Sequence, residues 1–329
     1  MPGGPPRGRI LWHELLTTDP AAAVAFYRKV IGWGSAAFAA DDPSYRLWTM
    51  QGASMGGLMQ MPSDAQAPPN WLMYVAVPDV DQAMEQAARL GARTWVPVTD
   101  IPNVTRFAVL GDPQGATFAV MKPLMPGVGS DDAVVGDFSW HELATTDWKA
   151  SWEFYRALFG WERAASFDMG KMGTYWMFRR GGGTRTLGGM FNQTGAAPAH
   201  WLSYVRVPDV DRAAALARRH GGKVVNGPMD VPSGARIAML ADPQGAAFAV
   251  HRPAAEAPAP GTTAKAGANA KATAKAKKNK KTAPKPKKVA GKTTRKARRK
   301  PGKKSPRALL KKPVSKSRKP AKKRPTRGR

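Results

Sequence analysis

An internal duplication constrains the fold of this 329-residue chain more than any other feature. The tetrapeptide Trp-His-Glu-Leu begins at Trp12 and again at Trp140, 128 positions later. The pentapeptide Asp-Pro-Gln-Gly-Ala begins at Asp112 and again at Asp242, 130 positions later. Matches that recur in the same order over this length predict two homologous domains.

The repeats also set the domain boundaries, which we place at residues 8–124 and 136–253. Segment 125–135 between them contains Pro, Gly, Ser and Asp, a composition typical of a linker. Residues 254–329 follow the second copy and share none of its motifs. The sequence therefore predicts two folded domains followed by a segment of another kind.

Each domain contains a shorter pattern of strands and helices. In the first domain, strand-forming residues 9–16 precede Asp19-Pro20, and this pair predicts a helix start with Asp as the N-cap and Pro at the first helical position. Gly32 predicts the helix end. A second strand and helix occupy residues 72–91, and turn-broken strand sequence follows each helix. Each domain is therefore expected to hold two β-α-β-β-β units in an α+β fold.

A strand, an Asp-capped helix that contains Phe-Tyr and ends in Gly, and a late Asp-Pro-x-Gly turn follow one another in both copies. This order resembles the vicinal oxygen chelate superfamily, which includes glyoxalase I, the extradiol dioxygenases and the bleomycin-resistance proteins. The resemblance covers nearly all of both domains and none of the tail. It implies a curved mixed sheet in each domain, shaped as a cup for a divalent metal or a small organic ligand. Since this fold carries many chemistries, the side chains of the cup have to define the function.

The metal ligands that the resemblance implies are missing from their expected places on the first, fifth and last strands. The six residues at those places are Trp12, Trp140, Leu72, Leu202, Ala119 and Ala249. His13 and His141 lie one residue away, and a shift of one residue turns a strand side chain to the opposite face. The sequence therefore favours no cofactor.

The second domain leaves a metal site open as the alternative. His200 and His251 each lie two residues from an expected ligand position. Together with His141 and Glu142 they offer nitrogen and oxygen ligands for Zn, Fe or Mn. The first domain carries other residue types at the places of His200 and His251, so this set is not shared by the two copies.

The side chains that both copies share predict a small organic ligand. They offer aromatic faces for stacking, an Arg for an anionic group and a Glu for a hydrogen-bond donor. The set is Trp12, Glu14, Tyr74 and Arg106 in the first domain, and Trp140, Glu142, Tyr204 and Arg236 in the second. The alternative is structural: a Glu–Arg pair that closes the sheet, with Trp and Tyr in the core. For His13 and His141 we expect pairing to a neighbouring strand rather than general-base catalysis.

The tail carries nearly all of the net charge of +29. Residues 254–329 hold 21 Lys, 8 Arg and one acid, whereas residues 1–253 are close to neutral and contain every aromatic residue. High charge with little apolar surface predicts disorder. The composition resembles the C-terminal tails of linker histones and bacterial histone-like proteins. Such a tail suits salt-dependent, sequence-independent binding to the phosphates of duplex DNA or another nucleic acid.

The basic runs of the tail are the predicted nucleic-acid contacts. They comprise Lys277, Lys278, Lys280, Lys281, Lys287, Lys288, Arg295, Lys296, Arg298, Arg299 and Lys300. A solubility tail, a localisation signal and anionic lipid are the alternatives. The spacing of the lysines forms no amphipathic stripe, which argues against a helix lying on a membrane.

The absence of Cys and of long apolar runs indicates the cellular compartment. The chain has no Cys, which excludes a disulfide framework, a Cys-ligated zinc site and a cysteine nucleophile. The first residues lack the apolar stretch of a signal peptide, and no run approaches the roughly 18 apolar residues of a membrane span. We expect a cytoplasmic protein associated with the nucleoid or chromatin, without a membrane partner.

Three functions fit the sequence. The first is a metal-free binding protein for a small organic ligand, tethered to nucleic acid by its tail. The second is a metal-dependent enzyme of the glyoxalase or dioxygenase type, a lyase or a dioxygenase, with its site in the second domain only. The third makes the body a scaffold or dimerisation unit. Pairing of the two tandem domains within the chain is compatible with all three.

Overall fold

The computed structural model describes residues 7–39, 42–65, 67–124 and 133–254. The basic tail and its predicted nucleic-acid contacts lie outside these ranges. The chain divides into a unit from Met1 to Thr262 and a unit from Thr263 to Arg329, and the fold described below belongs to the first. None of the helices in the described ranges is long and apolar enough to cross a membrane.

The first domain alternates strands and helices as its sequence predicts. Its elements are β1 (Ile10–Thr17), α1 (Pro20–Val30), β2 (Gly34–Ala39), β3 (Asp42–Met50), β4 (Ala53–Gln60), β5 (Asn70–Ala76), α2 (Val80–Arg89), β6 (Arg93–Ile101), β7 (Thr105–Gly111) and β8 (Thr117–Pro123). A strand, a helix and three strands thus occur twice in succession.

The second domain repeats this order. Its elements are β9 (Phe138–Thr145), α3 (Trp148–Phe159), β10 (Glu162–Asp168), the short 3-10 helix η1 (Gly170–Met172), β11 (Thr174–Arg179), β12 (Thr186–Asn192), β13 (His200–Arg206), α4 (Val210–Arg219), β14 (Lys223–Asp230), β15 (Arg236–Ala241) and β16 (Ala247–Arg252). The prediction of paired β-α-β-β-β units is confirmed in both domains.

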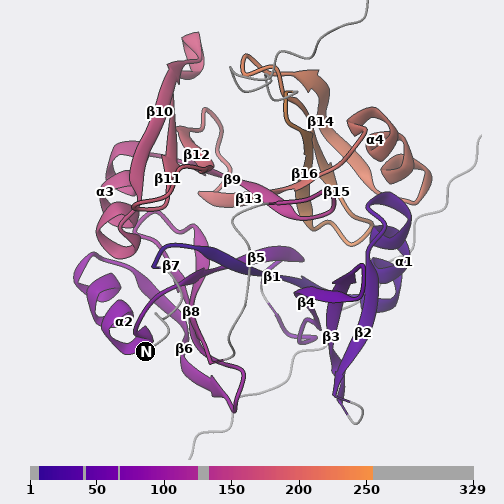
Figure 1. Ribbon diagram of the computed structural model, residues 1–329, viewed down its shortest axis with the longest axis horizontal. Coiled ribbons are helices and arrows are strands. Elements are labelled where there is room, and N and C mark those ends of the chain that lie inside the picture. The colour runs from indigo at the N-terminus through magenta and orange to yellow at the C-terminus, as the bar shows by residue number, and fades with distance from the viewer. Residues whose placement is uncertain (1–6, 40–41, 66, 125–132, 255–329) are drawn as a thin grey trace, which may run out of the picture. The chain divides into compact units, whose positions relative to one another are not determined.

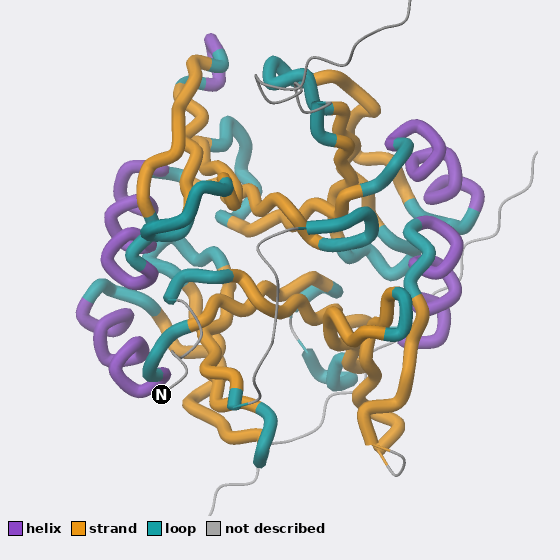
Figure 2. Tube along the Cα trace, in the orientation of Figure 1, coloured by secondary structure: helices purple, strands orange, loops and turns teal. Residues whose placement is uncertain are grey.

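Each domain forms one eight-stranded mixed sheet. The strand order is β2-β3-β4-β1-β5-β8-β7-β6 in the first and β10-β11-β12-β9-β13-β16-β15-β14 in the second. The two units of a domain meet where β1 pairs antiparallel with β5, or β9 with β13. Figures 1 and 2 show each sheet bent into a U, with its concave side turned away from the other domain and its helices on the convex side.

Aspartate caps begin all four α-helices of the described ranges. The carboxylate of Asp19 accepts a hydrogen bond from the backbone N–H of Ala22 at 2.9 Å, and Pro20 occupies the first helical position. Equivalent caps are made by Asp79, Asp147 and Asp209. A side-chain acceptor at this place satisfies an otherwise unpaired N–H of the first turn, which explains the recurrence of Asp in both copies.

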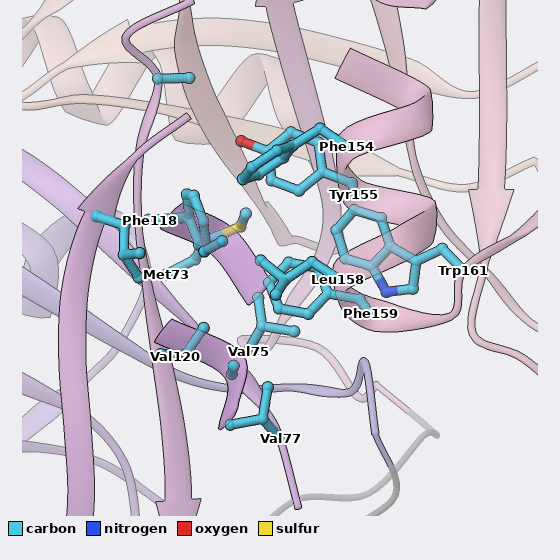
Figure 3. Packing of buried hydrophobic residues seen from close by; sticks show 14 of the residues in the cluster. Met73, Val75, Val77, Phe118, Val120, Phe154, Tyr155, Leu158, Phe159 and Trp161 are labelled. Carbon is cyan, nitrogen blue, oxygen red and sulfur yellow. The ribbon is translucent and has the colours of Figure 1, made fainter. Parts of the chain in front are cut away.

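Two large hydrophobic cores hold the convex sides together, and each contains residues of both domains. The first joins β5, α2, β7 and β8 to α3 and its neighbouring strands; Figure 3 shows Val75 and Phe118 among Tyr155 and Phe159. The second core joins α1 and its strands to α4, β13, β15 and β16. Each core therefore combines one half of the first domain with the opposite half of the second.

A buried hydrogen-bond chain crosses the domain boundary inside the second core. Tyr27 donates its hydroxyl to Asp242 at 3.2 Å and accepts the indole N–H of Trp71 at 2.8 Å. The other oxygen of Asp242 accepts backbone N–H groups of Gln244 and Ala246 at 3.0 and 2.9 Å. The Asp-Pro-Gln-Gly turn thus binds one carboxylate oxygen of Asp242 to its own backbone and presents the other to the opposite domain.

The first core contains the equivalent series of hydrogen bonds, with the two domains exchanged. Tyr155 donates to Asp112 at 3.0 Å and accepts from the indole of Trp201 at 2.9 Å. We call these two Trp–Tyr–Asp chains the clasp. Two further indoles donate across the boundary at 2.8 Å: Trp33 to the carbonyl of Gly136, and Trp161 to the carbonyl of Gly8. The motifs repeated in the sequence are therefore largely the residues that join the domains.

Removing one clasp hydroxyl should destabilise both domains together. In Tyr27→Phe, the carboxylate of Asp242 and the indole of Trp71 lose a buried partner, which should cost about 1–3 kcal/mol of unfolding free energy. Denaturant unfolding should remain a single transition at a lower midpoint, and hydrogen exchange should increase in peptides from both domains. Trp95→Phe, on the exposed edge strand β6, is the control. Exchange that increases in one domain alone would contradict the shared-core arrangement.

Candidate functional site

Strand β1 sends alternate side chains to the two faces of its sheet. His13 and Leu15 face the other domain, whereas Trp12 and Glu14 face the concave side. This follows from the twofold periodicity of a strand. In the Trp-His-Glu-Leu motif, His and Leu therefore lie at the domain interface, and Trp and Glu lie on the concave face.

We name the concave faces the first cup and the second cup. The first cup contains Leu11, Trp12, Glu14, Tyr45, Leu72, Tyr74, Ala76, Phe107, Val109, Ala119 and Met121. The second cup contains Ser139, Trp140, Glu142, Tyr175, Leu202, Tyr204, Arg206, Ile237, Met239, Ala249 and His251. Both are mainly apolar, with one glutamate near the middle strands.

The glutamate of the first cup is held by two phenols. Tyr45 donates its hydroxyl to Oε2 of Glu14 at 2.7 Å, and Tyr74 donates to Oε1 at 3.2 Å. Glu14 is only 7% exposed. Both carboxylate oxygens thus have a hydrogen-bond donor, as a buried carboxylate requires.

The second cup repeats this arrangement. Tyr175 donates to Oε2 of Glu142 at 2.9 Å and Tyr204 donates to Oε1 at 3.0 Å. The indole of Trp140 donates in turn to the hydroxyl of Tyr175 at 3.0 Å. The two cups therefore share a polar cluster made of one Glu, two Tyr and one Trp.

Burial changes the proton affinity of this cluster. It raises the pKa of Glu14 and of Glu142, while the phenol hydrogen bonds counteract part of that rise. Burial and the adjacent carboxylate also raise the pKa of all four phenols, so they remain protonated donors. Each cup consequently offers hydrogen-bond acceptors to a ligand, and a carboxylate that takes up a proton more readily than an exposed one.

The structure brings together six of the eight side chains predicted to bind the ligand. Trp, Glu and Tyr of each copy share a concave face: Trp12, Glu14 and Tyr74 in the first, Trp140, Glu142 and Tyr204 in the second. In the structural alternative, the Glu–Arg pair is wrong, because the partners of both glutamates are phenols. Its other part holds for the tyrosines, since Tyr74 and Tyr204 are buried in the apolar clusters of the two sheets.

The two predicted arginines lie elsewhere, which corrects the predicted set. Phe107 occupies the concave side of β7, so the neighbouring Arg106 lies on the helix-covered side. There it forms ion pairs with Asp81 of α2 at 2.9 Å and with Asp100 at 2.5 Å. Arg236 of β15 does the same with Asp211 and Asp230 at 2.6 and 3.1 Å.

Sequence reasoning missed the second phenol of each cluster. Tyr45 and Tyr175 are 130 positions apart, which is the spacing of the Asp-Pro-Gln-Gly-Ala copies. The duplication itself was therefore the available signal. Tyr45 lies on β3 and Tyr175 on β11, two strands away from the glutamate, and only the folded sheet shows that they reach it.

The four possible metal ligands of the second domain do not converge. His141 faces the other domain, His200 is exposed with Nδ1 against the carbonyl of Pro198, and His251 is hydrogen-bonded to Ser139. Within the described ranges no group of three or more His, Asp or Glu side chains is placed to hold a metal ion. Alanine occupies the last-strand ligand position in both cups, so the donors present do not fit the metal site that the fold family implies.

His13 and His141 pair with each other across the domain boundary, which the sequence did not predict; His141 also bonds the neighbouring strand β12, as expected. Their Nε2 atoms are 2.9 Å apart, and the ring of His13 stacks on Phe138 at 3.9 Å. Nδ1 of His141 lies 3.2 Å from the carbonyl of Leu187 and donates to it, so His141 accepts at Nε2 and His13 donates. Burial lowers the pKa of both rings, that of His141 to about 4.

Two family models match the chain. The Glyoxalase/Bleomycin resistance protein/Dioxygenase superfamily matches residues 137–250, and a glyoxalase-like domain matches residues 13–121. CFP32 of Mycobacterium tuberculosis, provisionally named a glyoxylase, is 32% identical over 251 residues, covering 74% of this chain and 94% of that protein. The anthracycline biosynthesis protein DauV of Streptomyces sp. (strain C5) is 31% identical over 267 residues, covering 76% and 93%. The chain belongs to the glyoxalase/bleomycin resistance protein/dioxygenase superfamily.

Solved structures share the fold at lower identity. The Mn(II)-bound glyoxalase from Novosphingobium aromaticivorans has a TM-score of 0.54 at 15% identity, covering 75% of this chain and 82% of that one. An extradiol ring-cleaving dioxygenase from B. fuscum has a TM-score of 0.56 at 17% identity, covering 78% and 75%. These likenesses concern the arrangement of the strands and helices.

The buried histidine pair should make stability fall in mild acid. The pKa of each histidine is lower in the folded chain than in the unfolded chain, so below about pH 6.5 the unfolded chain binds protons that the folded chain does not bind. This difference lowers the free energy of unfolding by up to about 1.4 kcal/mol per pH unit for each histidine. His13→Gln keeps a donor to His141 but cannot be protonated. The loss of unfolding free energy between pH 6.5 and 5 should be about 1–2 kcal/mol smaller in this variant. His220→Gln changes an exposed histidine and is the control; an unchanged pH profile in His13→Gln would contradict the assignment.

Proposed function

We propose that the protein binds a planar organic molecule in its cups, on the shared cluster of Glu, two Tyr and Trp. The observation that carries this proposal is the repetition of the cluster on both concave sides, where it forms a polar centre among largely buried apolar side chains. A few placed polar groups among apolar and aromatic side chains are typical of small-molecule sites. The polar centre orients the ligand and the aromatic rings supply contact area.

The tryptophans provide the stacking surface. Trp12 and Trp140 are only partly buried, unlike the fully buried Trp33 and Trp161 of the domain interface. A ring placed beside Trp140 also adjoins the phenols that surround Glu142. The phenol oxygens retain acceptor capacity for a hydroxyl or amine of the ligand. The name of one relative refers to the biosynthesis of anthracyclines, which are planar polycyclic molecules, and this supports a ligand of that shape.

Metal-dependent catalysis is the alternative, and two structural neighbours are a metal-bound glyoxalase and a dioxygenase. It requires His200 and His251 to act with Glu142, and these side chains differ in their surroundings: His200 is exposed, whereas His251 is hydrogen-bonded to Ser139. Stoichiometric Zn, Fe or Mn in the purified chain, lost in His200→Ala, would favour the enzyme over the binding protein.

Ligand binding should be divided between the two cups. In a calorimetric titration with 1-naphthol, the chain should bind two molecules, and Trp12→Ala or Trp140→Ala should each weaken one site roughly tenfold through lost stacking and contact area. Trp148→Ala removes a partly buried indole from α3, on the helix-covered side of the second sheet, and should change neither site. Equal binding by the chain and by the Trp12→Ala/Trp140→Ala variant would refute the proposed site.

We propose further that the tail anchors the cups to duplex DNA. The supporting observation is its composition: a net charge of +28 in residues 254–329 without an aromatic residue, which suits phosphate neutralisation and not base stacking. The strands, helices and cores described above all end before residue 254. We therefore expect the body to fold without the tail.

Shortening the chain after Pro253 should remove this binding. In a gel-shift titration with a 30-base-pair duplex, affinity should fall by roughly a hundredfold or more, and the affinity of the full chain should fall steeply with added salt. The thermal midpoint of the body should stay the same. Unchanged affinity, or binding by the full chain that ignores salt, would contradict the proposal.

A further inference from the structure

The two cups differ at three equivalent positions that lie next to one another. Each position carries an apolar residue in the first cup and a polar one in the second. The pairs are Leu11 and Ser139, Ala76 and Arg206, and Met121 and His251. In both sheets the last two positions are direct neighbours in the strand register, Ala76 with Met121 and Arg206 with His251.

The three polar residues form one group at the edge of the second cup. Nε2 of His251 is hydrogen-bonded to the hydroxyl of Ser139, and both side chains are buried. Arg206 lies beside His251 on the adjacent strand, and its charge adds to burial in lowering the pKa of that histidine. The ring of His251 meets Tyr204 edge-on at 6.1 Å. The group is therefore continuous with the cluster around Glu142.

The residues that the structure describes use only part of the hydrogen-bonding capacity of the Arg206 side chain. Nη1 donates to the carbonyl of Ala133 at 2.9 Å, and no carboxylate of the described residues forms an ion pair with this guanidinium. A guanidinium has five N–H donors in a planar fork that matches a carboxylate. Arg236 of the same sheet shows the contrast, because two aspartates neutralise it. Placing an unneutralised cation at the edge of an apolar face costs free energy unless an anion meets it there.

We propose that the second cup binds an organic carboxylate, with the anionic group on Arg206 beside the Ser139–His251 pair and the apolar body along Trp140 and Tyr204. This inference rests on the proposed function, since it names the ligand class of one of the two cups. The first cup, with Leu11, Ala76 and Met121 at the same places, takes uncharged ligands. The two halves of the chain thus bind different compounds.

The test compares two probes that differ only in charge, 1-naphthoate and 1-naphthamide, by calorimetric titration of the full chain in about 0.15 M salt. One site should prefer naphthoate. Arg206→Ala installs the residue of the first domain and should weaken naphthoate at that site roughly tenfold or more, while naphthamide binding stays within about twofold. Arg206→Gln, which keeps more of the side-chain volume, provides a second variant should the alanine variant unfold.

The controls separate this inference from the proposed function. Arg236→Ala removes the same charge from the helix-covered side and should change neither affinity. All variants carry the same basic tail, so nonspecific attraction of naphthoate to the tail cancels in the comparison. Equal affinity for the two probes, or naphthoate binding unchanged in Arg206→Ala and Arg206→Gln, overturns the carboxylate assignment and leaves small-molecule binding standing. Failure of both probes to bind either cup overturns both.

Discussion

The clasp is the constraint on which the rest of this structure depends. A carboxylate inside a core is unfavourable unless donors surround it, and Asp112 and Asp242 obtain one of those donors from a tyrosine of the opposite domain. The same tyrosines accept hydrogen bonds from the indole N–H groups of Trp71 and Trp201. Each Trp–Tyr–Asp series therefore fixes the distance and orientation between the two sheets. The convex faces are consequently occupied by the contact between the domains, and the concave faces take no part in it.

Much of the fold follows from the sequence because its signals are local. Asp caps, glycine stops and alternating strands give the order of elements, and the duplication at 128–130 positions gives two sheets. The packing could not be predicted in the same way. The repetition of the Phe-Tyr pair indicates that Phe26 and Tyr27 have a role in both copies, but it does not identify their partners. Phe26 contacts Phe248 and Tyr27 contacts Asp242, each more than 200 positions away. No local pattern specifies such partners.

The cups show the same division. Counting alternate residues along β1 and along β5 correctly placed Glu14 and Tyr74 on a common face, since strand parity is local. It failed for Arg106, where the neighbouring Phe107 takes the concave position, and it missed Tyr45, which comes from a strand that the order of the chain does not place near Glu14. Of the polar edge of the second cup, the sequence singled out only His251, as a possible metal ligand. Ser139 and Arg206 were missed, because a search for the residues that the copies share passes over positions where they differ.

Strand parity also separates the residues that the two copies share from those at which they can differ. Along each central strand, one set of alternating residues packs into a core that both domains share. A substitution in this set therefore disturbs the packing of both domains. The intervening residues face only the cup of their own domain, where we propose that the ligand binds. A cup residue can therefore differ between the two copies, as Ala76 and Arg206 do, while the contact between the domains stays the same; under the proposed function, such a difference changes the ligand.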